Sequence, residues 1–227
     1  MTITRTNGGG GGGSGTLTTV KDEGTNLSTA ATSMDFVGAG VTATGGPAIT
    51  VTIPGAAITL ITETVLGGTS SNVSFTSIPS TYRDLIVVVR GRGDKSASAS
   101  CEVRLRMNND TGSNYDYQMG LMNQSNDADV EGRAQTYILL GYLTAATAPS
   151  NMPGAICARI YDYRGTTFYK PLTSQNDLPA VVSSGGFIYN NVSVGDYRSS
   201  SAVNRVDVFP DSGNFIAGDV FSLYGCL

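Results

Sequence analysis

Short apolar segments alternate with clusters of turn-forming residues along the larger, second part of the chain. In segment 101–107, Val103, Leu105 and Met107 alternate with charged residues, and this period of two predicts a half-buried β-strand. Segment 85–89 is apolar at every position, which predicts a central strand or a strand covered by a second subunit. On these grounds we predict strands over residues 58–65, 72–75, 84–90, 101–107, 135–143, 155–162, 186–189, 203–209 and 220–224.

No part of the chain shows the 3.6-residue period of an amphipathic helix over a convincing length. Short segments at this spacing, rich in Val, Ile, Tyr and Thr, are typical of antiparallel sandwiches. We therefore predict an all-β fold in which residues 56–227 form a jelly-roll-like antiparallel β-sandwich of about eight or nine strands.

The first 55 residues have a different character. Residues 8–13 are six consecutive glycines, which predict a tether because each glycine loses the most backbone freedom when it is ordered. Residues 16–55 contain few large side chains, although Ile49, Val51 and Ile53 alternate with threonine in the manner of a strand. Such a segment buries too little area alone, so it needs partner chains. We predict an anchor and tether over 1–15, a trimerising stalk over 16–55 and the sandwich over 56–227.

Composition excludes several function classes. The chain has 227 residues, a formal net charge of -4 and no histidine, which removes Ser-His-Asp and Cys-His catalysis and imidazole metal ligands. The densest cationic stretch, 83–95, also carries Asp84 and Asp94, so no basic face for nucleic acid is expected. We predict no catalytic residue, no metal site and no cofactor.

Cysteine use and apolar run length indicate the compartment. Cys101, Cys157 and Cys226 are far apart in the sequence, and their neighbours predict three buried thiols rather than disulfides. No segment approaches the roughly 20 apolar residues of a membrane span, and the first seven residues lack the apolar core of a secretory signal. We expect synthesis in a reducing cytoplasm and no membrane insertion.

Tyrosine next to asparagine, serine and glycine is typical of recognition loops, because the ring supplies stacking area and the small polar residues adapt their hydrogen bonds. Half-buried packing at strand ends is the competing interpretation of the same tyrosines. The asparagine-rich segment 108–116 predicts a turn rather than a calcium loop, since it lacks the terminal glutamate of an EF-hand. The candidate receptor contacts are Asn109, Asp110, Asn114, Tyr115, Tyr117, Tyr189 and Tyr197.

Two other patterns have ordinary explanations. Arg92, Gly93 and Asp94 form the tripeptide found in integrin ligands, but the glycine also suits a turn leaving the preceding strand. Carboxylate pairs are the one enzymatic route left open, because a glycoside hydrolase needs only two acids at a defined separation. Asp127, Asp129 and Glu131 form such an acidic cluster, although a hydrated loop is the commoner reason for one.

Segments 20–27, 34–44 and 49–53 resemble a short module that recurs in tail fibres and other virion appendages of tailed bacteriophages, where three chains wind into a small β-rich prism. Segments 75–85, 106–115 and 221–225 are similar to a globular β-sandwich of phage fibres and head decorations. The resemblance implies a homotrimeric protein of the virion surface, assembled in the bacterial host cytoplasm. Its N-terminal arm, with Ile3 and Arg5 as candidate anchor residues, would dock on tail, baseplate or major capsid proteins.

Three functions follow from this resemblance. The first is a short, non-enzymatic fibre that attaches the particle to host envelope glycan. The alternative is a capsid cement or decoration protein that stabilises the head. The third is a polysaccharide depolymerase that uses acids such as Asp127 or Asp129.

Overall fold

The structure is a computed structural model of the 227-residue chain. It describes residues 2–5, 17–22, 25–28, 42–44, 50–52, 57–122, 128–180 and 187–227, with side chains in 57–122, 129–179 and 189–227. The chain divides into two compact units, unit 1 (Met1–Gly55) and unit 2 (Ala56–Leu227). All regular elements in the described ranges are β-strands, and no helix there is long and apolar enough to span a bilayer.

Unit 1 consists of short strands with many threonines. β1 (Thr2–Arg5), β2 (Leu17–Asp22) and β3 (Thr25–Ser28) form an antiparallel sheet, and β4 (Thr42–Thr44) pairs with β5 (Thr50–Thr52). β5 lies within the segment 49–53 that the alternation assigns to a strand. The predicted glycine tether at 8–13 lies outside the described residues.

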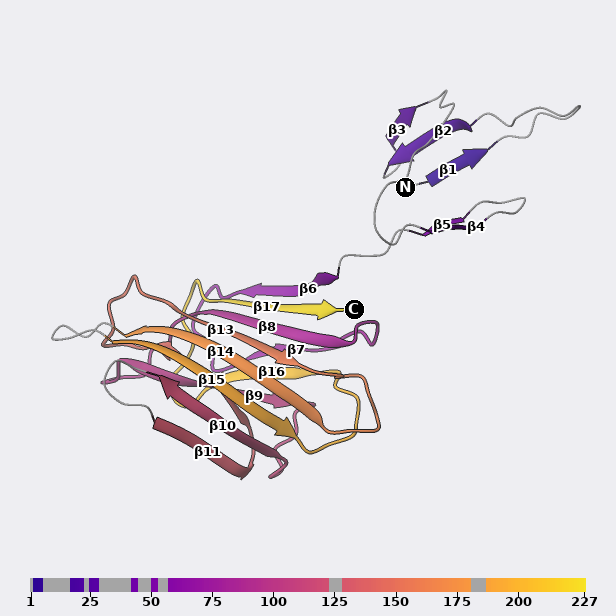
Figure 1. Cartoon of the computed structure of the whole chain (residues 1–227). Helices are drawn as coiled ribbons and strands as arrows, with labels where there is room; N and C mark the ends of the chain where they lie inside the picture. The colour runs from indigo at the N-terminus through magenta and orange to yellow at the C-terminus, as the bar shows by residue number, and fades with distance from the viewer. Residues whose placement is uncertain are drawn as a thin grey trace, which may run out of the picture. The chain divides into compact units, whose positions relative to one another are not determined.

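Unit 2 contains two antiparallel sheets (Figure 1). The larger sheet has the order β11-β10-β15-β14-β13-β8-β17-β6, and the smaller has the order β12-β9-β16-β7. The strands are β6 (Ile58–Val65), β7 (Val73–Phe75), β8 (Asp84–Gly91), β9 (Ser100–Met107), β10 (Tyr115–Met122), β11 (Ala128–Gln135), β12 (Ile138–Thr144), β13 (Gly154–Ile160), β14 (Lys170–Ala180), β15 (Phe187–Tyr197), β16 (Val206–Pro210) and β17 (Val220–Cys226).

All nine predicted strand segments overlap strands of unit 2, which confirms the all-β prediction. The count was too low, since β10, β11 and β14 were missed and β15 continues to Tyr197. β14 escaped the pattern because it carries two prolines and several polar residues. Pro171 is the second residue of β14, and Pro179 lies beyond Asp177, the last β14 residue that pairs with β13, so each proline stands where the ladder needs fewer donors.

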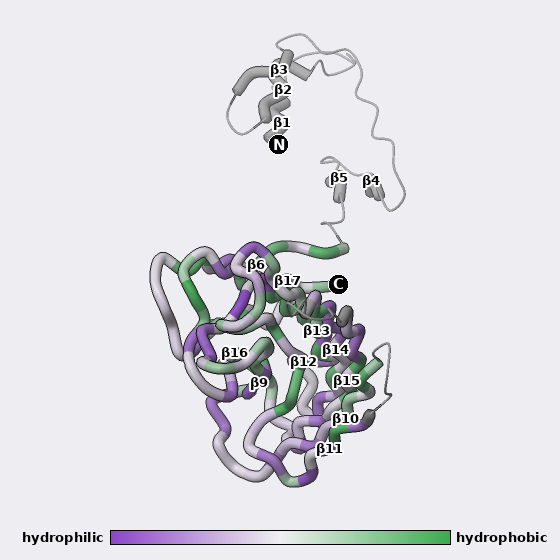
Figure 2. The backbone as a smooth tube through the Cα atoms, turned by 90° about the vertical axis from the view of Figure 1, so that its left-hand side faces the viewer, coloured by the Kyte–Doolittle hydropathy of each residue, from purple (hydrophilic) through white to green (hydrophobic). Residues whose placement is uncertain are grey.

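Both sheets contribute to one hydrophobic core. Alternate residues of β9 are buried, as predicted, and they meet buried residues of β8, β13 and β17 from the larger sheet. Figure 2 shows hydrophobic and hydrophilic residues following one another along the strands of this unit. β8 pairs with both β13 and β17, so the apolar segment 85–89 does form a central strand. Burial of this area is the main stabilising contribution to the fold.

The cysteine prediction is correct for two residues and wrong for one. Cys101 and Cys226 are buried, but Cys157 is exposed. Cys157 alternates with the buried Ile156 and Ala158 on β13, so its thiol points to the outer face of the larger sheet, away from the smaller one. The apolar neighbours in the sequence indicated a strand but not which face carries the thiol.

A buried amide links the two sheets. Asn176 on β14 is 1% exposed, and its Oδ1 accepts hydrogen bonds from the Tyr142 backbone N–H at 2.9 Å and from Asn191 Nδ2 at 2.8 Å. Its Nδ2 donates to the carbonyls of Tyr142 at 2.7 Å and Ala155 at 2.9 Å. Gly141 gives this amide its space, because a Cβ at Gly141 would lie 2.6 Å from the Asn176 Cβ.

Candidate functional site

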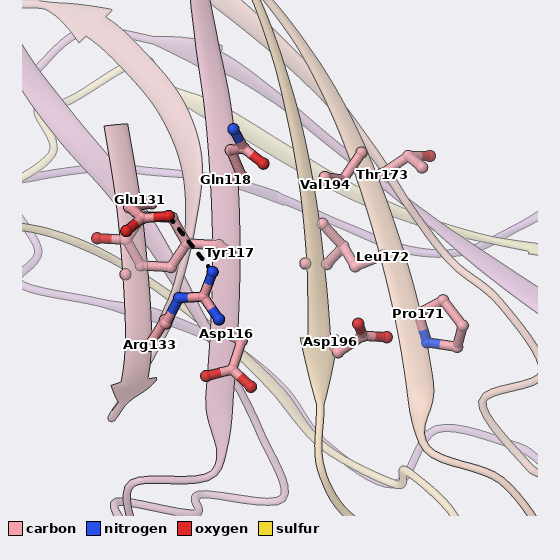
Figure 3. Close-up of a pocket in the computed structure, with 12 residues that line it drawn as sticks. Asp116, Tyr117, Gln118, Glu131, Arg133, Pro171, Leu172, Thr173, Val194 and Asp196 are labelled. Atoms are coloured by element: carbon pink, nitrogen blue, oxygen red, sulfur yellow. Dashed lines mark ion pairs between the residues drawn. The ribbon is translucent and has the colours of Figure 1, made fainter. Parts of the chain in front are cut away.

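A shallow groove of about 370 Å³ lies on the larger sheet, where β10, β11, β14 and β15 run side by side (Figure 3). Each strand contributes three consecutive residues. The lining consists of Asp116, Tyr117, Gln118, Glu131, Gly132, Arg133, Pro171, Leu172, Thr173, Val194, Gly195 and Asp196.

Strand register assembles this lining. Gln118 pairs with Glu131 on one side and with Val194 on the other, and Val194 in turn pairs with Thr173. Side chains that are in register on neighbouring strands project from the same face at about 5 Å spacing. These four residues therefore form one row across two pairs of consecutive strands that come from separate parts of the chain.

A glycine on the edge strand accommodates a tyrosine ring beneath the groove. A Cβ at Gly132 would lie 2.5 Å from the Tyr117 ring, so only glycine lets that ring lie against β11. The ring of Tyr117 also stacks on that of Tyr137, with centroids 5.9 Å apart. The ring of Tyr117 packs against the hydrophobic core, so it supports the floor of the groove from the inner side of the sheet.

The groove has an excess of negative charge. Three carboxylates, those of Asp116, Glu131 and Asp196, face one guanidinium, that of Arg133. Glu131 and Arg133 form an exposed ion pair at 3.7 Å, which is dashed in Figure 3. Such an exposed pair contributes little to stability, so both side chains are available to a ligand.

Two of these acids stand directly opposite each other. Asp116 on β10 pairs in register with Asp196 on β15, an arrangement that destabilises a sheet because like charges repel. Asp116 is partly compensated, since its Oδ1 accepts from the Ala134 N–H at 2.6 Å and its Oδ2 lies 3.4 Å from Arg198 Nε. A local conflict of this kind is typical of functional surfaces.

The groove suits an uncharged ligand rich in hydroxyl groups. Carboxylates accept hydrogen bonds from hydroxyls, while the Gln118 amide and the Thr173 hydroxyl both donate and accept. Val194 and Pro171 add apolar surface. An anionic ligand would be repelled by the excess of carboxylates. No cluster of three or more His, Cys, Asp or Glu suited to a metal occurs within the described ranges.

No known protein-family model matches this chain, and no curated protein is significantly similar to it.

The asparagine-rich segment is a hydrogen-bonded turn, as predicted. The Asp110 carboxylate accepts from the Gly112 N–H at 2.7 Å, from Asn114 Nδ2 at 2.9 Å and from the Tyr197 hydroxyl at 3.1 Å. The hydrogen bond from Asn114 is the main reason that the pKa of Asp110 is lowered. Asn109 is exposed at this turn, so Asn109 remains available as a surface contact, whereas Asp110 and Asn114 hold the turn together.

Two of the predicted receptor contacts must be corrected. Tyr115 is fully buried and Tyr197 is 3% exposed, and their rings stack with centroids 4.8 Å apart. The Tyr115 hydroxyl is held in the interior, where it donates to the Met107 carbonyl at 3.1 Å. Both tyrosines are thus core residues that secure the turn from below, and neither reaches a ligand.

Of the remaining candidates, Tyr117 lines the groove, and Tyr189 lies half-buried on β15 outside it. Ile3 and Arg5 belong to β1, and their side chains lie outside the described ones. In the acidic cluster, Glu131 lines the groove, Asp129 is exposed on β11 beside it, and Asp127 lies outside the described residues.

The Arg92-Gly93-Asp94 tripeptide is part of the framework. Arg92 Nη2 donates to the carbonyls of Ala145 at 2.9 Å and Ala148 at 3.1 Å. The Asp94 carboxylate accepts from the backbone N–H of Asn214 at 2.6 Å. The two charged side chains are engaged within the fold, so the tripeptide is not a displayed motif. Arg92 and Gly93 pair with other segments as isolated β-bridges, so the turn that the glycine suggested does not form at this place.

Sequence reasoning missed most of the groove. Asp116, Gln118 and Thr173 lie in strands that the hydrophobic pattern did not reveal. Val194 and Asp196 lie in the part of β15 beyond the predicted segment 186–189, and no local motif marks any of the five. The signal that could have found them was the alternation of apolar and polar residues within 115–122 and 187–197. This alternation shows that the residues share a face only when the register between the strands is known.

Proposed function

We propose that this chain is a homotrimeric, non-enzymatic surface protein of a tailed-bacteriophage virion, a short fibre whose sandwich binds neutral glycan of the host envelope. The observation that carries the proposal is the groove, in which polar side chains from four strands face outward beside apolar surface. This combination of donors, acceptors and small apolar contacts is what a polyhydroxylated ligand requires.

Unit 1 supplies the assembly function in this proposal. Its short strands, with few large side chains, suit a β-prism-like stalk in which three copies complete one another's core. The arm that contains Ile3 and Arg5 docks on other virion proteins, and the jelly-roll-like sandwich is displayed outward. The sequence resemblance to phage appendage modules supports the same arrangement.

Glycan binding is tested by titrating the full-length protein with host envelope polysaccharide fragments in a calorimeter. Gln118→Ala removes a groove side chain in the middle of the row, and we expect affinity to fall about ten-fold. Gln175→Ala is the matched control, because Gln175 is exposed on the same sheet but does not line the groove. Equal affinities of the two variants would overturn the assignment of the groove.

The virion role is tested separately. Labelled antibodies viewed on particles by electron microscopy would place the protein on the tail if the fibre proposal is correct, whereas labelling of the head would favour capsid decoration. Release of reducing ends from host polysaccharide, lost in Glu131→Gln, would show that the groove is hydrolytic and would refute the non-enzymatic proposal.

A further inference from the structure

The edge strand β6 exposes large apolar side chains. Ile58, Leu60 and Val65 are 55%, 49% and 60% exposed, although isoleucine, leucine and valine are usually buried. All three pair with β17 residues that point to the outer face of the larger sheet. Figure 2 shows the start of β6 as a hydrophobic segment.

The apolar surface continues from β6 onto the two neighbouring strands. Leu60 pairs with Tyr224, which pairs with Ile86, and Val65 pairs with Val220. These partners are half-buried, as is Val88 on β8, so an uncovered patch extends over three strands. We call this surface the β6 face; it consists of Ile58, Leu60, Val65, Ile86, Val88, Val220 and Tyr224.

The two edge strands of the larger sheet, β11 and β6, differ in the number of charged side chains that they expose. β11, at one edge, carries exposed Asp129, Glu131 and Arg133 at alternate positions, and charges there discourage pairing with another chain. β6, at the other edge, has one charged residue, Glu63, whose carboxylate accepts a hydrogen bond from Ser222 at 2.9 Å. β6 therefore lacks the usual protection against association.

Connectivity and charge indicate what covers this face. β6 begins at Ile58, three residues after Gly55, the last residue of unit 1. Three residues span at most about 10 Å, so copies joined through unit 1 are tethered close to their β6 strands. The one charge within the β6 face is that of Glu63, whose partner Ser222 lies between Tyr224 and Val220 on β17. One carboxylate there, against three in the groove, leaves little repulsion between two copies.

We infer that the β6 face is an interface between copies of this chain, on which the sandwich of a neighbouring copy packs. The inference rests on the proposed homotrimer and adds to it that the sandwiches, and not only unit 1, contact each other. Burying such apolar side chains removes them from water and stabilises the assembly.

The test compares two cysteine substitutions in the full-length protein. Cys157→Ser removes the one exposed thiol among the three cysteines. Leu60→Cys then places a thiol in the β6 face, and Val192→Cys places one on the same sheet outside both this face and the groove. Leu60 and Val192 are 49% and 43% exposed in a single copy, so their cysteines should react equally when nothing covers either.

We expect the thiol of Leu60→Cys to react with a water-soluble maleimide about ten-fold more slowly than that of Val192→Cys, while sedimentation shows an oligomer. Equal rates in an oligomer would overturn the inference and leave the proposed trimer standing. Equal rates in a monomer would overturn both. Slow reaction of Leu60→Cys in a monomer would show that the face is covered within one chain, which also overturns a second copy as its occupant.

Discussion

Asn176→Ala is expected to destabilise unit 2 strongly, because the Asn176 amide is the polar link between the two sheets. The substitution removes four hydrogen bonds, one from Tyr142 N–H, one from Asn191 and two donated to backbone carbonyls. The loss falls on groups that are already far from water, since Asn176 and Asn191 are both 1% exposed.

The magnitude follows from the groups left without partners. The N–H and C=O of Tyr142 both lose the bond that Asn176 supplies, and a buried polar group left unsatisfied costs about 1–3 kcal/mol. Asn191 also loses the acceptor of its Nδ2, and its Oδ1 already lacks a partner, so the substitution leaves a second buried amide unsatisfied. We therefore expect a loss of roughly 2–5 kcal/mol in the free energy of unfolding, the lower end applying if water enters the vacated space.

The assay is urea denaturation followed by tyrosine fluorescence, which suits a chain with 11 tyrosines and no tryptophan. Gln175→Ala is the control, since Gln175 is adjacent in β14 but exposed on the opposite face, and its substitution should change stability by less than about 0.5 kcal/mol. If the two variants differ by less than about 1 kcal/mol, the cross-sheet amide does not stabilise the fold as argued.

Three further predictions concern buried and hydrogen-bonded residues of unit 2 outside the groove. Burial raises the pKa of Asp219 from 3.8 to about 6, so the folded state binds this proton more tightly than the unfolded state does. The stability that this group contributes is full below pH 4 and is lost as the pH rises through 6. Asp219→Asn should therefore weaken the pH dependence of the free energy of unfolding, measured by denaturation, across that range. Gly93→Ala places a Cβ 2.4 Å from Cys101 Sγ and should cost about 1–3 kcal/mol, with Cys101→Ala restoring part of the lost melting temperature. Arg92→Lys loses the planar guanidinium that bridges two carbonyls and should lower the free energy of unfolding by about 2 kcal/mol, whereas an unchanged midpoint would contradict this role.

The local sequence pattern was sufficient to predict a strand and its buried face where one face of the strand is apolar and the other is polar. β9 shows this most clearly, because its buried and half-buried residues alternate along its whole length. β14 shows the opposite case, because Asn176 and Ser174 are buried and Gln175 between them is exposed. Since all three residues are polar, the sequence does not indicate which side of β14 faces the core. Asn176 is tolerated in the interior because it finds partners on β12, a strand more than 30 residues away, whereas the buried Ser174 hydroxyl has no hydrogen-bond partner among the described residues.

The candidate site could be predicted only in fragments. Tyr117 and Glu131 were chosen from the sequence and line the groove, whereas Tyr115 and Tyr197 were chosen by the same reasoning and lie in the core. Tyr115 and Tyr117 are two residues apart and both incline inward, so their different exposure depends on what packs above each ring. Tyr197 stacks on Tyr115, a contact that only the pairing of β10 with β15 creates.

By itself, the sequence determined that the chain is built from β-strands, where most strands lie and that histidine-dependent chemistry is absent. The period of two and the composition are local properties, and they carry that information directly. Only the tertiary structure decided which side of each strand faces the core, and which residues of β10, β11, β14 and β15 meet to form the groove. Register between distant strands depends on the packing of the whole sandwich, and a shift of one residue would turn every groove side chain to the opposite face.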